Sequence, residues 1–304
     1  MHGEAREQTA GPSPPLFLAP IPNATLALGP ESSGSRIDVV HPAWREETVM
    51  WKRIALLLAA SLLALSPCIA QDAAADDLDS GGGENASNPL SKVKNTDVRI
   101  QYFDNPDGSE RWDYWLADGA FMATDKLKIK YEVHYWDTDI TGTSESALES
   151  IRIKLIYFPK NGTLGKWKYR MAVGADWILD FDNLDKGIGF GADQIAPFFG
   201  MALVKKPGWV FIPLIQQFLS YSGVDTNQTA LRLIVIQTLP KQAWVKYDIK
   251  VPFDWENDTI PATTEAQLGM MFKKNFGAYA DVLAGIGSDR PYDWGIGVGV
   301  RFLY

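Results

Sequence analysis

Apolar side chains recur at every second position along the last eleven residues of the chain, separated by glycines, Arg301 and Leu303. Six apolar or aromatic residues occupy every second position: Trp294, Ile296, Val298, Val300, Phe302 and Tyr304. Side chains of a β-strand point to its two faces in turn, so such a strand has one fully apolar face. That face needs a hydrocarbon partner, which a membrane or the interior of a sheet can supply.

The same alternation, together with turn residues, predicts twelve strands and no amphipathic helix from about Thr96 onward. The predicted strands cover 97–104, 111–122, 126–136, 147–158, 166–178, 187–204, 208–222, 228–239, 242–254, 263–274, 276–287 and 293–304. A tilted membrane strand needs about nine to eleven residues, whereas soluble strands average about five or six. The lengths therefore predict an all-β protein: a transmembrane antiparallel up-and-down β-barrel of about 12 strands.

The connections between these predicted strands alternate between tight turns and longer loops. Lysines gather in the turns, as at 205–206 and 273–274, whereas the loops are acidic, as at 137–147 and 180–186. Outer-membrane barrels have short periplasmic turns and long external loops. We expect the acidic loops to face outward, where their charge keeps them soluble; a divalent-ion bridge from these loops to lipopolysaccharide is the alternative.

A secretory signal precedes the strands. Basic residues at Lys52 and Arg53 lead into an apolar run of about twelve residues, too short for a membrane-spanning helix of roughly twenty, and small residues follow as far as Ala70. We predict a signal peptide over 50–70, an authentic start at Met50, and a non-native extension over 1–49. A lipoprotein signal acylated on Cys68 is the alternative, which Pro67 disfavours.

The mature chain would contain no cysteine, because Cys68 is the only one. Removing residues 1–70 takes away five basic and six acidic residues and changes the formal net charge from −8 to −7. Residues 71–95 are rich in Ala, Gly and Asp, and we predict a flexible periplasmic leader there, followed by the barrel at 96–304. The predicted location is the bacterial outer membrane, and a soluble periplasmic β-protein is the alternative.

The predicted strands have a charged face that would line a lumen, because charges are costly against lipid. The candidates are Lys128, Lys130, Glu132, His134, Arg152, Lys154, Lys168, Arg170, Asp176, Arg232, Lys246, Asp248, Lys250, Asp281 and Arg301. Among them ten bases face four acids, an excess that would favour anionic solutes. Six tryptophans fall near predicted strand ends, where interfacial girdles form: Trp112, Trp115, Trp136, Trp177, Trp209 and Trp255.

No catalytic or metal-binding motif is recognisable, so we predict no enzymatic activity, no cofactor, no metal and no nucleic-acid partner. His134 is the only histidine of the predicted mature chain and lacks a serine motif beside it. The acidic segment 180–185 departs from a calcium loop, because Asp185 replaces the required glycine.

Residues 187–304 resemble bacterial outer-membrane transporters of the phenol-degradation MetA-pathway type. The resemblance rests on the segments 187–191 with Pro197, 206–209, 220–223, 239–240, 254–256 and 285–294. It implies an outer-membrane barrel that moves small, often aromatic compounds, and it brings no catalytic or binding residues.

We therefore predict a monomeric outer-membrane channel or transporter for small solutes, anionic or aromatic. Its expected partners are outer-membrane lipid, lipopolysaccharide, the solute, and the barrel-assembly machinery acting on the final strand at Tyr304. The alternatives are a closed structural barrel without transport and a lipid-modifying enzyme that uses His134.

Overall fold

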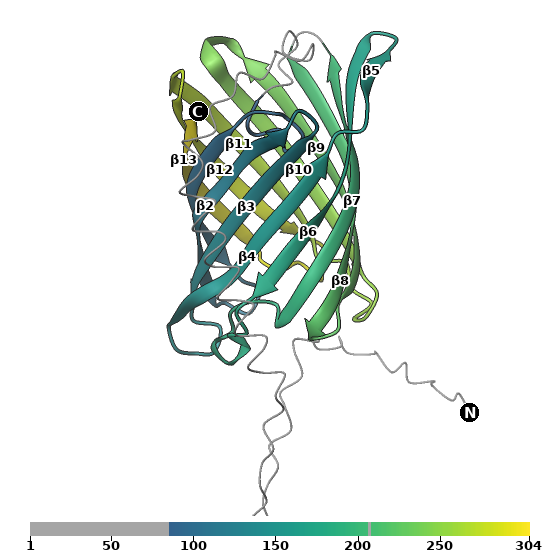
Figure 1. Cartoon of the computed structure of the whole chain (residues 1–304). Helices are drawn as coiled ribbons and strands as arrows, with labels where there is room; N and C mark the ends of the chain where they lie inside the picture. Colours follow the sequence, from purple (N-terminus) through teal and green to yellow (C-terminus); the bar gives the residue numbers. More distant parts are fainter. Residues whose placement is uncertain (1–84, 206–207) are drawn as a thin grey trace, which may run out of the picture. The chain divides into compact units, whose positions relative to one another are not determined.

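A computed structural model of the protein describes residues 85–205 and 208–304 (Figure 1). The predicted extension 1–49, the predicted signal peptide 50–70 and the leader as far as residue 84 lie outside the described residues. Thirteen labelled strands of the described residues form one antiparallel sheet. No helix in this part of the chain is both long and apolar enough to cross a membrane.

Successive strands are antiparallel neighbours throughout the sheet, except that β4 and β5 both pair with β6. Their bounds are β1 Asn95–Asp104, β2 Glu110–Thr124, β3 Leu127–Thr138, β4 Glu145–Tyr157, β5 Asn161–Leu164, β6 Trp167–Asp180, β7 Ala192–Lys205, β8 Trp209–Gly223, β9 Asn227–Leu239, β10 Ala243–Asp254, β11 Ala262–Lys273, β12 Phe276–Ile286 and β13 Trp294–Leu303. β1 pairs with both β2 and β13, and β4 pairs with both β3 and β6. The sheet therefore closes into a barrel, and only the short strand β5, which pairs with β6 alone, keeps an open edge.

The barrel has twelve strands, because β4 and β5 form one interrupted strand. β4 pairs with β6 as far as Tyr157 opposite Val173, and β5 resumes the pairing at Asn161 opposite Arg170. Between them the chain leaves β3 at Phe158, and Pro159 has no N–H to donate to a ladder. β5 and the start of β6 thus extend as a hairpin beyond the end of β3. The predicted barrel of twelve antiparallel strands is confirmed.

The predicted strand 187–204 begins later than expected, at Ala192. Gly187, Gly189 and Gly191 all adopt positive φ values of 69°, 90° and 65°, which an extended strand excludes. They follow the short 3₁₀ helix η2, Leu184–Lys186, within the loop between β6 and β7. Alternation of glycines with Ile188 and Phe190 therefore imitated a strand where the backbone forms a glycine-rich loop.

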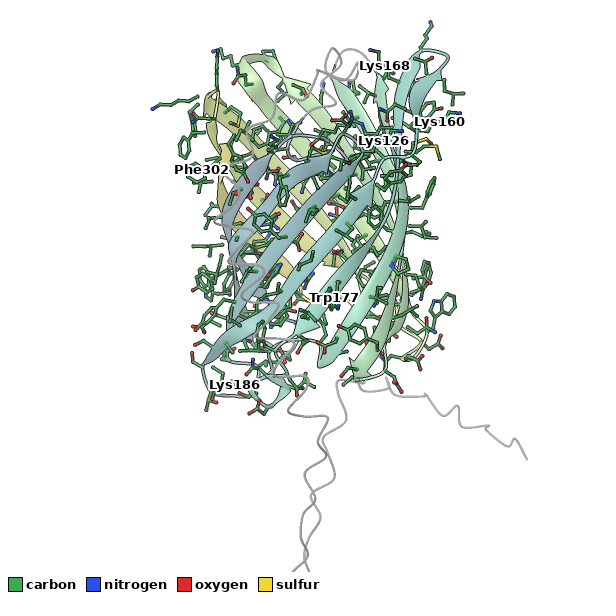
Figure 2. The ribbon with its side chains drawn as sticks, viewed as in Figure 1. Lys126, Lys160, Lys168, Trp177, Lys186 and Phe302 are labelled. Atoms are coloured by element: carbon green, nitrogen blue, oxygen red, sulfur yellow. The ribbon has the colours of Figure 1, made fainter. Side chains whose placement is uncertain are left out.

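The two ends of the barrel differ in the length of their connections. At one end, two or three residues join β2 to β3, β5 to β6, β7 to β8 and β11 to β12, and the 3₁₀ helix η3, Pro240–Gln242, joins β9 to β10. At the other end the loops are 105–109, 139–144, 181–191, 224–226, 255–261 and 287–293. Figure 2 labels Lys126 and Lys160 at the turn end and Lys186 at the loop end.

The outer wall exposes large apolar side chains in rows. In β13, Trp294, Ile296, Val298 and Phe302 are all exposed, and Val298 reaches 62%. The glycines and Arg301 of the same strand are buried on the inner face. Large apolar patches on water-facing surfaces are unusual for a soluble monomer, so this wall requires surrounding hydrocarbon.

Small inward residues of β13 make room for side chains of the neighbouring strands. A Cβ on Gly299 would overlap the Tyr279 ring from β12, and one on Gly295 would contact Phe103 from β1. Glycine at these positions lets bulky neighbours lie across the inner surface of the wall. The alternating glycines of the final strand are therefore a packing requirement.

Proline interrupts strand pairing locally rather than producing bulges. The β7–β8 pairing lacks the Met201–Pro213 pair, whereas the register shifts occur elsewhere, such as between Trp115 and Ala117. Pro252 lies beyond Lys250, where the β10–β11 pairing ends. Pro252 thus falls where no β11 partner is needed, whereas Pro213 leaves a gap within the β7–β8 ladder.

The six tryptophans predicted for the interface fall into two groups. Trp112, Trp177 and Trp255 are exposed on the outside, and Trp209 stacks on Phe211. Figure 2 places Trp177 and Phe302 toward opposite ends of the barrel. Trp115 and Trp136 point inward instead, so the girdle prediction is wrong for these two.

Candidate functional site

The interior of the barrel contains a belt of charged side chains between an apolar zone near the turns and an aromatic zone near the loops. On β3, Lys130 bridges Asp118 at 2.9 Å and also contacts Glu132. His134 lies between two carboxylates, with Nδ1 3.2 Å from Asp113 and Nε2 3.5 Å from Glu132. This side of the lumen is a continuous polar network.

The network continues across β4 and β6. Arg152 contacts Glu149 at 3.4 Å, and its Nε donates to the Ser150 hydroxyl at 3.1 Å. Lys154 pairs with Asp176 at 2.6 Å. The amide of Gln216, on β8, donates to the same aspartate at 3.1 Å. The belt thus connects side chains of β4, β6 and β8.

On the opposite side, ion pairs connect β9 to β10 and β10 to β11. Arg232 forms a two-pronged pair with Asp248, at 2.8 and 2.5 Å. Lys246 pairs with Glu265 at 2.6 Å.

Asp281 belongs to the same side of the belt. Arg99 lies 3.7 Å from its carboxylate, and the Gln267 amide donates to it at 2.8 Å. Most charges of the belt are therefore neutralised by a partner within the wall.

Lys250 on β10 is the exception in this belt. Its Nζ lies 5.0 Å from the centre of the Phe218 ring, and no carboxylate of the described residues lies within ion-pair distance of it. The positive charges of Arg232, Arg152 and Lys154 repel the Lys250 ammonium group, and the carboxylate of Asp248 attracts it. Basic groups from β4, β9 and β10 therefore converge on this part of the lumen.

Four of the predicted lumen bases lie toward the turn end. Lys128, Arg170 and Arg301 are buried and contact residues 85–91, the described part of the predicted leader that precedes Lys92. Figure 2 labels Lys168 near the turns, at the top of the view. These four bases are separate from the central belt.

Sequence reasoning missed seven inward charges. They are Asp97, Arg99, Arg111, Asp113, Asp118, Glu149 and Glu265. Adding these seven to the predicted candidates gives twelve bases and nine acids, so the basic excess falls from six to three; Asp180 and Asp193, which are buried near the loop end, are not counted.

Strand bulges explain several of these omissions. The shift between Trp115 and Ala117 brings both Asp113 and Asp118 inward, although they differ in parity. A second shift, opposite His134 and Tyr135, leaves Glu149 as an extra inward residue of β4. After a bulge, odd-numbered and even-numbered residues exchange faces. Strict alternation therefore assigns the residues that follow a bulge to the wrong face.

The loop end of the lumen is narrowed by aromatic residues around one arginine. The Arg111 guanidinium lies 4.4 Å from the Phe103 ring centre and 4.3 Å from that of Trp136. Tyr292, in the loop before β13, packs on Phe103, and its burial raises the pKa of the phenol to about 12. Phe190, in the loop between β6 and β7, contacts Trp136 edge-on.

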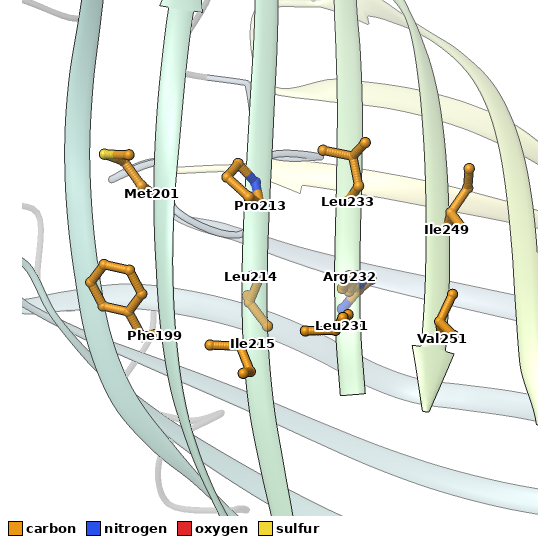
Figure 3. Close-up of a pocket in the computed structure, with 10 residues that line it drawn as sticks. All are labelled: Phe199, Met201, Pro213, Leu214, Ile215, Leu231, Arg232, Leu233, Ile249 and Val251. Atoms are coloured by element: carbon orange, nitrogen blue, oxygen red, sulfur yellow. The ribbon is translucent and has the colours of Figure 1, made fainter. Parts of the chain in front are cut away.

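A separate hollow of about 350 Å³ lies mainly on the outer face of β7–β10, around Pro213 (Figure 3). Its lining is almost wholly apolar and consists of Phe199, Met201, Pro213, Leu214, Ile215, Leu231, Arg232, Leu233, Ile249 and Val251. Most of these residues belong to the lipid-facing set, so membrane hydrocarbon fills such a hollow without a specific ligand. The charged belt is therefore the candidate site. No group of residues suited to hold a metal ion was found in the described part of the chain.

Comparison with known proteins found similar chains among the solved structures only. No protein-family model matches the sequence, and no curated protein sequence matches it. The NanC porin has a TM-score of 0.50 at 9% identity, over 68% of this chain and 98% of that one. The KdgM porin has a TM-score of 0.49 at 11% identity, over 69% and 99%. An outer membrane channel from Pseudomonas putida F1 has a TM-score of 0.48 at 8% identity, over 76% and 100%.

These likenesses concern the fold alone. A closed antiparallel barrel that exposes rows of apolar side chains and buries its charges satisfies every requirement of a membrane-spanning sheet. The protein is a transmembrane β-barrel of the bacterial outer membrane. The resemblance to transporters of the phenol-degradation MetA-pathway type stays a prediction.

Proposed function

We propose that this barrel is a channel for small anionic solutes and that the basic cluster around Lys250 is its anion-selecting element. The observation that carries the proposal is Lys250 itself, a lumen cation without a carboxylate at ion-pair distance among the described residues. Positive charge in a low-dielectric channel raises the local concentration of anions. The chemistry suits small carboxylates. The expectation of an aromatic solute rests only on the resemblance to the phenol-degradation transporters.

The closed structural barrel is a second candidate, supported by a different observation. Ion pairs such as Lys154–Asp176 and Arg232–Asp248 neutralise most of the belt, and buried apolar residues fill much of the turn end. A barrel of this kind would span the membrane and conduct nothing. Conductance separates the two candidates.

The lipid-modifying enzyme is less well supported. His134 is 2% exposed and points into the lumen between Asp113 and Glu132, away from the lipid-facing wall. Its register partner is Ser150, whose hydroxyl donates to Glu149 rather than to the histidine. A serine nucleophile would need hydrogen-bond contact with its general base.

Three partner expectations from the sequence remain proposals: outer-membrane lipid on the apolar wall, lipopolysaccharide at the acidic loops, and the assembly machinery at the final strand. We propose the first on the exposed rows of β13 and its neighbours.

The experiment is single-channel conductance of the full-length protein in planar bilayers, with ion selectivity taken from reversal potentials in a salt gradient. We expect anion selectivity that weakens in Lys250→Gln and weakens further in Lys250→Glu. Lys241→Gln is the matched control, because Lys241 is exposed in the turn between β9 and β10. Cation selectivity in the parent protein, or equal effects of both lysine variants, would overturn the proposal.

A further inference from the structure

Residues 85–91, immediately before the first strand, lie inside the barrel. Leu90 is 1% exposed and belongs to a buried apolar cluster of inward side chains. The other members of this cluster are Met122, Ile156, Phe158, Ala172, Phe198, Ala202, Val204, Val210, Ile212, Ile234, Ile236, Trp244 and Tyr279. These residues come from strands as far apart as β2, β8 and β12, so the cluster extends across the lumen near the turn end.

Two consecutive turns make this segment compact. The Asn85 carbonyl oxygen accepts from the amide of Asn88, and the Asn88 carbonyl accepts from the amide of Ser91. The side-chain oxygen of Asn88 also accepts from Leu90 N at 2.8 Å. Asn and Pro favour such turns, because Asn accepts from its own backbone and Pro presets φ. The sequence Asn88-Pro89-Leu90-Ser91 therefore folds into a knob with Leu90 at its apolar tip.

Side chains from four strands around the barrel hold this knob. Lys128 on β3 donates to the Ser91 carbonyl at 2.7 Å, and Arg170 on β6 donates to the Leu90 carbonyl at 3.1 Å.

The remaining contacts meet at Ser87. Arg301 on β13 donates to the Ser87 hydroxyl at 2.9 Å, and this hydroxyl donates to Gln267 on β11 at 2.8 Å. The four strands lie on different sides of the closed sheet, so the segment crosses the lumen rather than lining one wall.

We propose that residues 85–91 are a plug that closes the turn end of the lumen and that its withdrawal opens the channel. This inference rests on the channel function proposed above. The plug continues directly into β1 at Asn95, whose strand starts at the turn end. It can therefore leave through that end without breaking any strand pairing.

The contacts that hold the plug are separate from the strand pairings that close the wall. The described bonds from Lys128, Arg170 and Arg301 to the segment run to uncharged carbonyl and hydroxyl oxygens. Arg301 also forms a buried ion pair with Asp97 of the wall, which does not involve the segment. Each of the bonds to the segment has an ionised donor, so it is stronger than a bond between two neutral groups, but it crosses no pair of strands. Withdrawal would break these bonds but no strand pairing, so the barrel would stay closed along its wall.

The position of the plug is tested by thiol protection, which does not depend on conduction. Cys68 is the only cysteine of the chain, so Leu90→Cys in a Cys68→Ser background provides a single thiol. We expect this thiol to react with a water-soluble maleimide at least tenfold more slowly than that of Leu164→Cys, because Leu164 is 67% exposed. Equal reaction rates would overturn the proposal.

The closing role is tested by conductance of the full-length protein and three variants: Leu90→Asp, Ala86→Asp and a deletion of residues 85–91. An unpaired carboxylate is strongly disfavoured in an apolar cluster, so Leu90→Asp should raise the open fraction roughly tenfold or more, as the deletion should. Ala86→Asp adds the same charge to the same segment at a half-buried position outside the cluster, and we expect little change.

The outcomes separate the two proposals. Large currents only after release of the plug support it, and if those currents lack anion selectivity, the proposed function fails while the plug stands. Equal anion-selective currents in the parent protein and the deletion variant overturn the plug and leave the function. Silence of both, with the barrel folded by heat-modifiability on gels, overturns both.

Discussion

Asp97 and Arg301 face each other across the seam where the first strand meets the last. They are register partners of β1 and β13, with Nη2 and Oδ2 2.6 Å apart, and both side chains are almost fully buried. This pair bonds the two ends of the sheet, which are the segments most distant along the chain. It therefore stabilises the closed form of the barrel.

Removing one partner should be more harmful than removing both. Asp97→Ala leaves a buried guanidinium uncompensated, and such losses cost about 3–5 kcal/mol. We expect the urea midpoint of the refolded barrel to fall markedly in Asp97→Ala and less in the double variant Asp97→Ala/Arg301→Met. Asp107→Ala, in an exposed loop, is the control. A larger loss in the double variant would contradict this role.

Steric room at Gly299 should be essential to the final strand. Gly299→Leu places atoms where the Tyr279 ring lies, and overpacking of this kind costs about 1–3 kcal/mol or more. We expect a lower folding yield in lipid vesicles and partial rescue by Tyr279→Ala. Ala280→Leu adds apolar volume on the lipid face of the adjacent strand and should fold normally. If Tyr279→Ala did not restore the folding yield, a contact other than the Tyr279 ring would be responsible for the loss.

A charged side chain on the outer, lipid-facing side of the wall should destabilise the barrel. Val298 is 62% exposed on β13, and an arginine at the bilayer midplane of a barrel costs about 2–4 kcal/mol. Val298→Arg should therefore lower the free energy of unfolding measured in lipid vesicles. Asn257→Arg, in an exposed loop between β10 and β11, should have little effect. Equal stability of both variants would mean that β13 does not face lipid.

Selectivity should increase when a carboxylate of the belt is neutralised. Asp176 pairs with Lys154 at 2.6 Å, and Asp176→Asn keeps the shape while removing the charge that offsets the lysine. Reversal potentials should shift toward stronger anion preference, because the lumen gains positive charge. Asp185→Asn, on the loop between β6 and β7, should shift them less. A shift of the reversal potential toward cation preference would contradict the proposal that anions pass through this part of the lumen.

Predictions from the sequence were most successful where a strand alternates without bulges. In β3, Lys128, Lys130 and His134 all lie on the inward face, as their parity indicates. Alternation failed at 187–191, where glycines adopt positive φ, and in β2, where a bulge shifts the phase so that Asp118 points inward like Asp113. Each failure is a local backbone event that the spacing of apolar residues does not encode.

The sequence by itself determined the class of the protein: long alternating strands, tight turns at one end and loops at the other, and an inward face rich in charge. These properties depend on the two-residue period of a strand, which is local. Only the tertiary structure decided which charges neutralise each other, because Asp97 and Arg301 are 204 residues apart. Closure of the sheet also brought Leu90 and Ser91 against β3 and β6, and thus turned a segment of loop composition into part of the lumen.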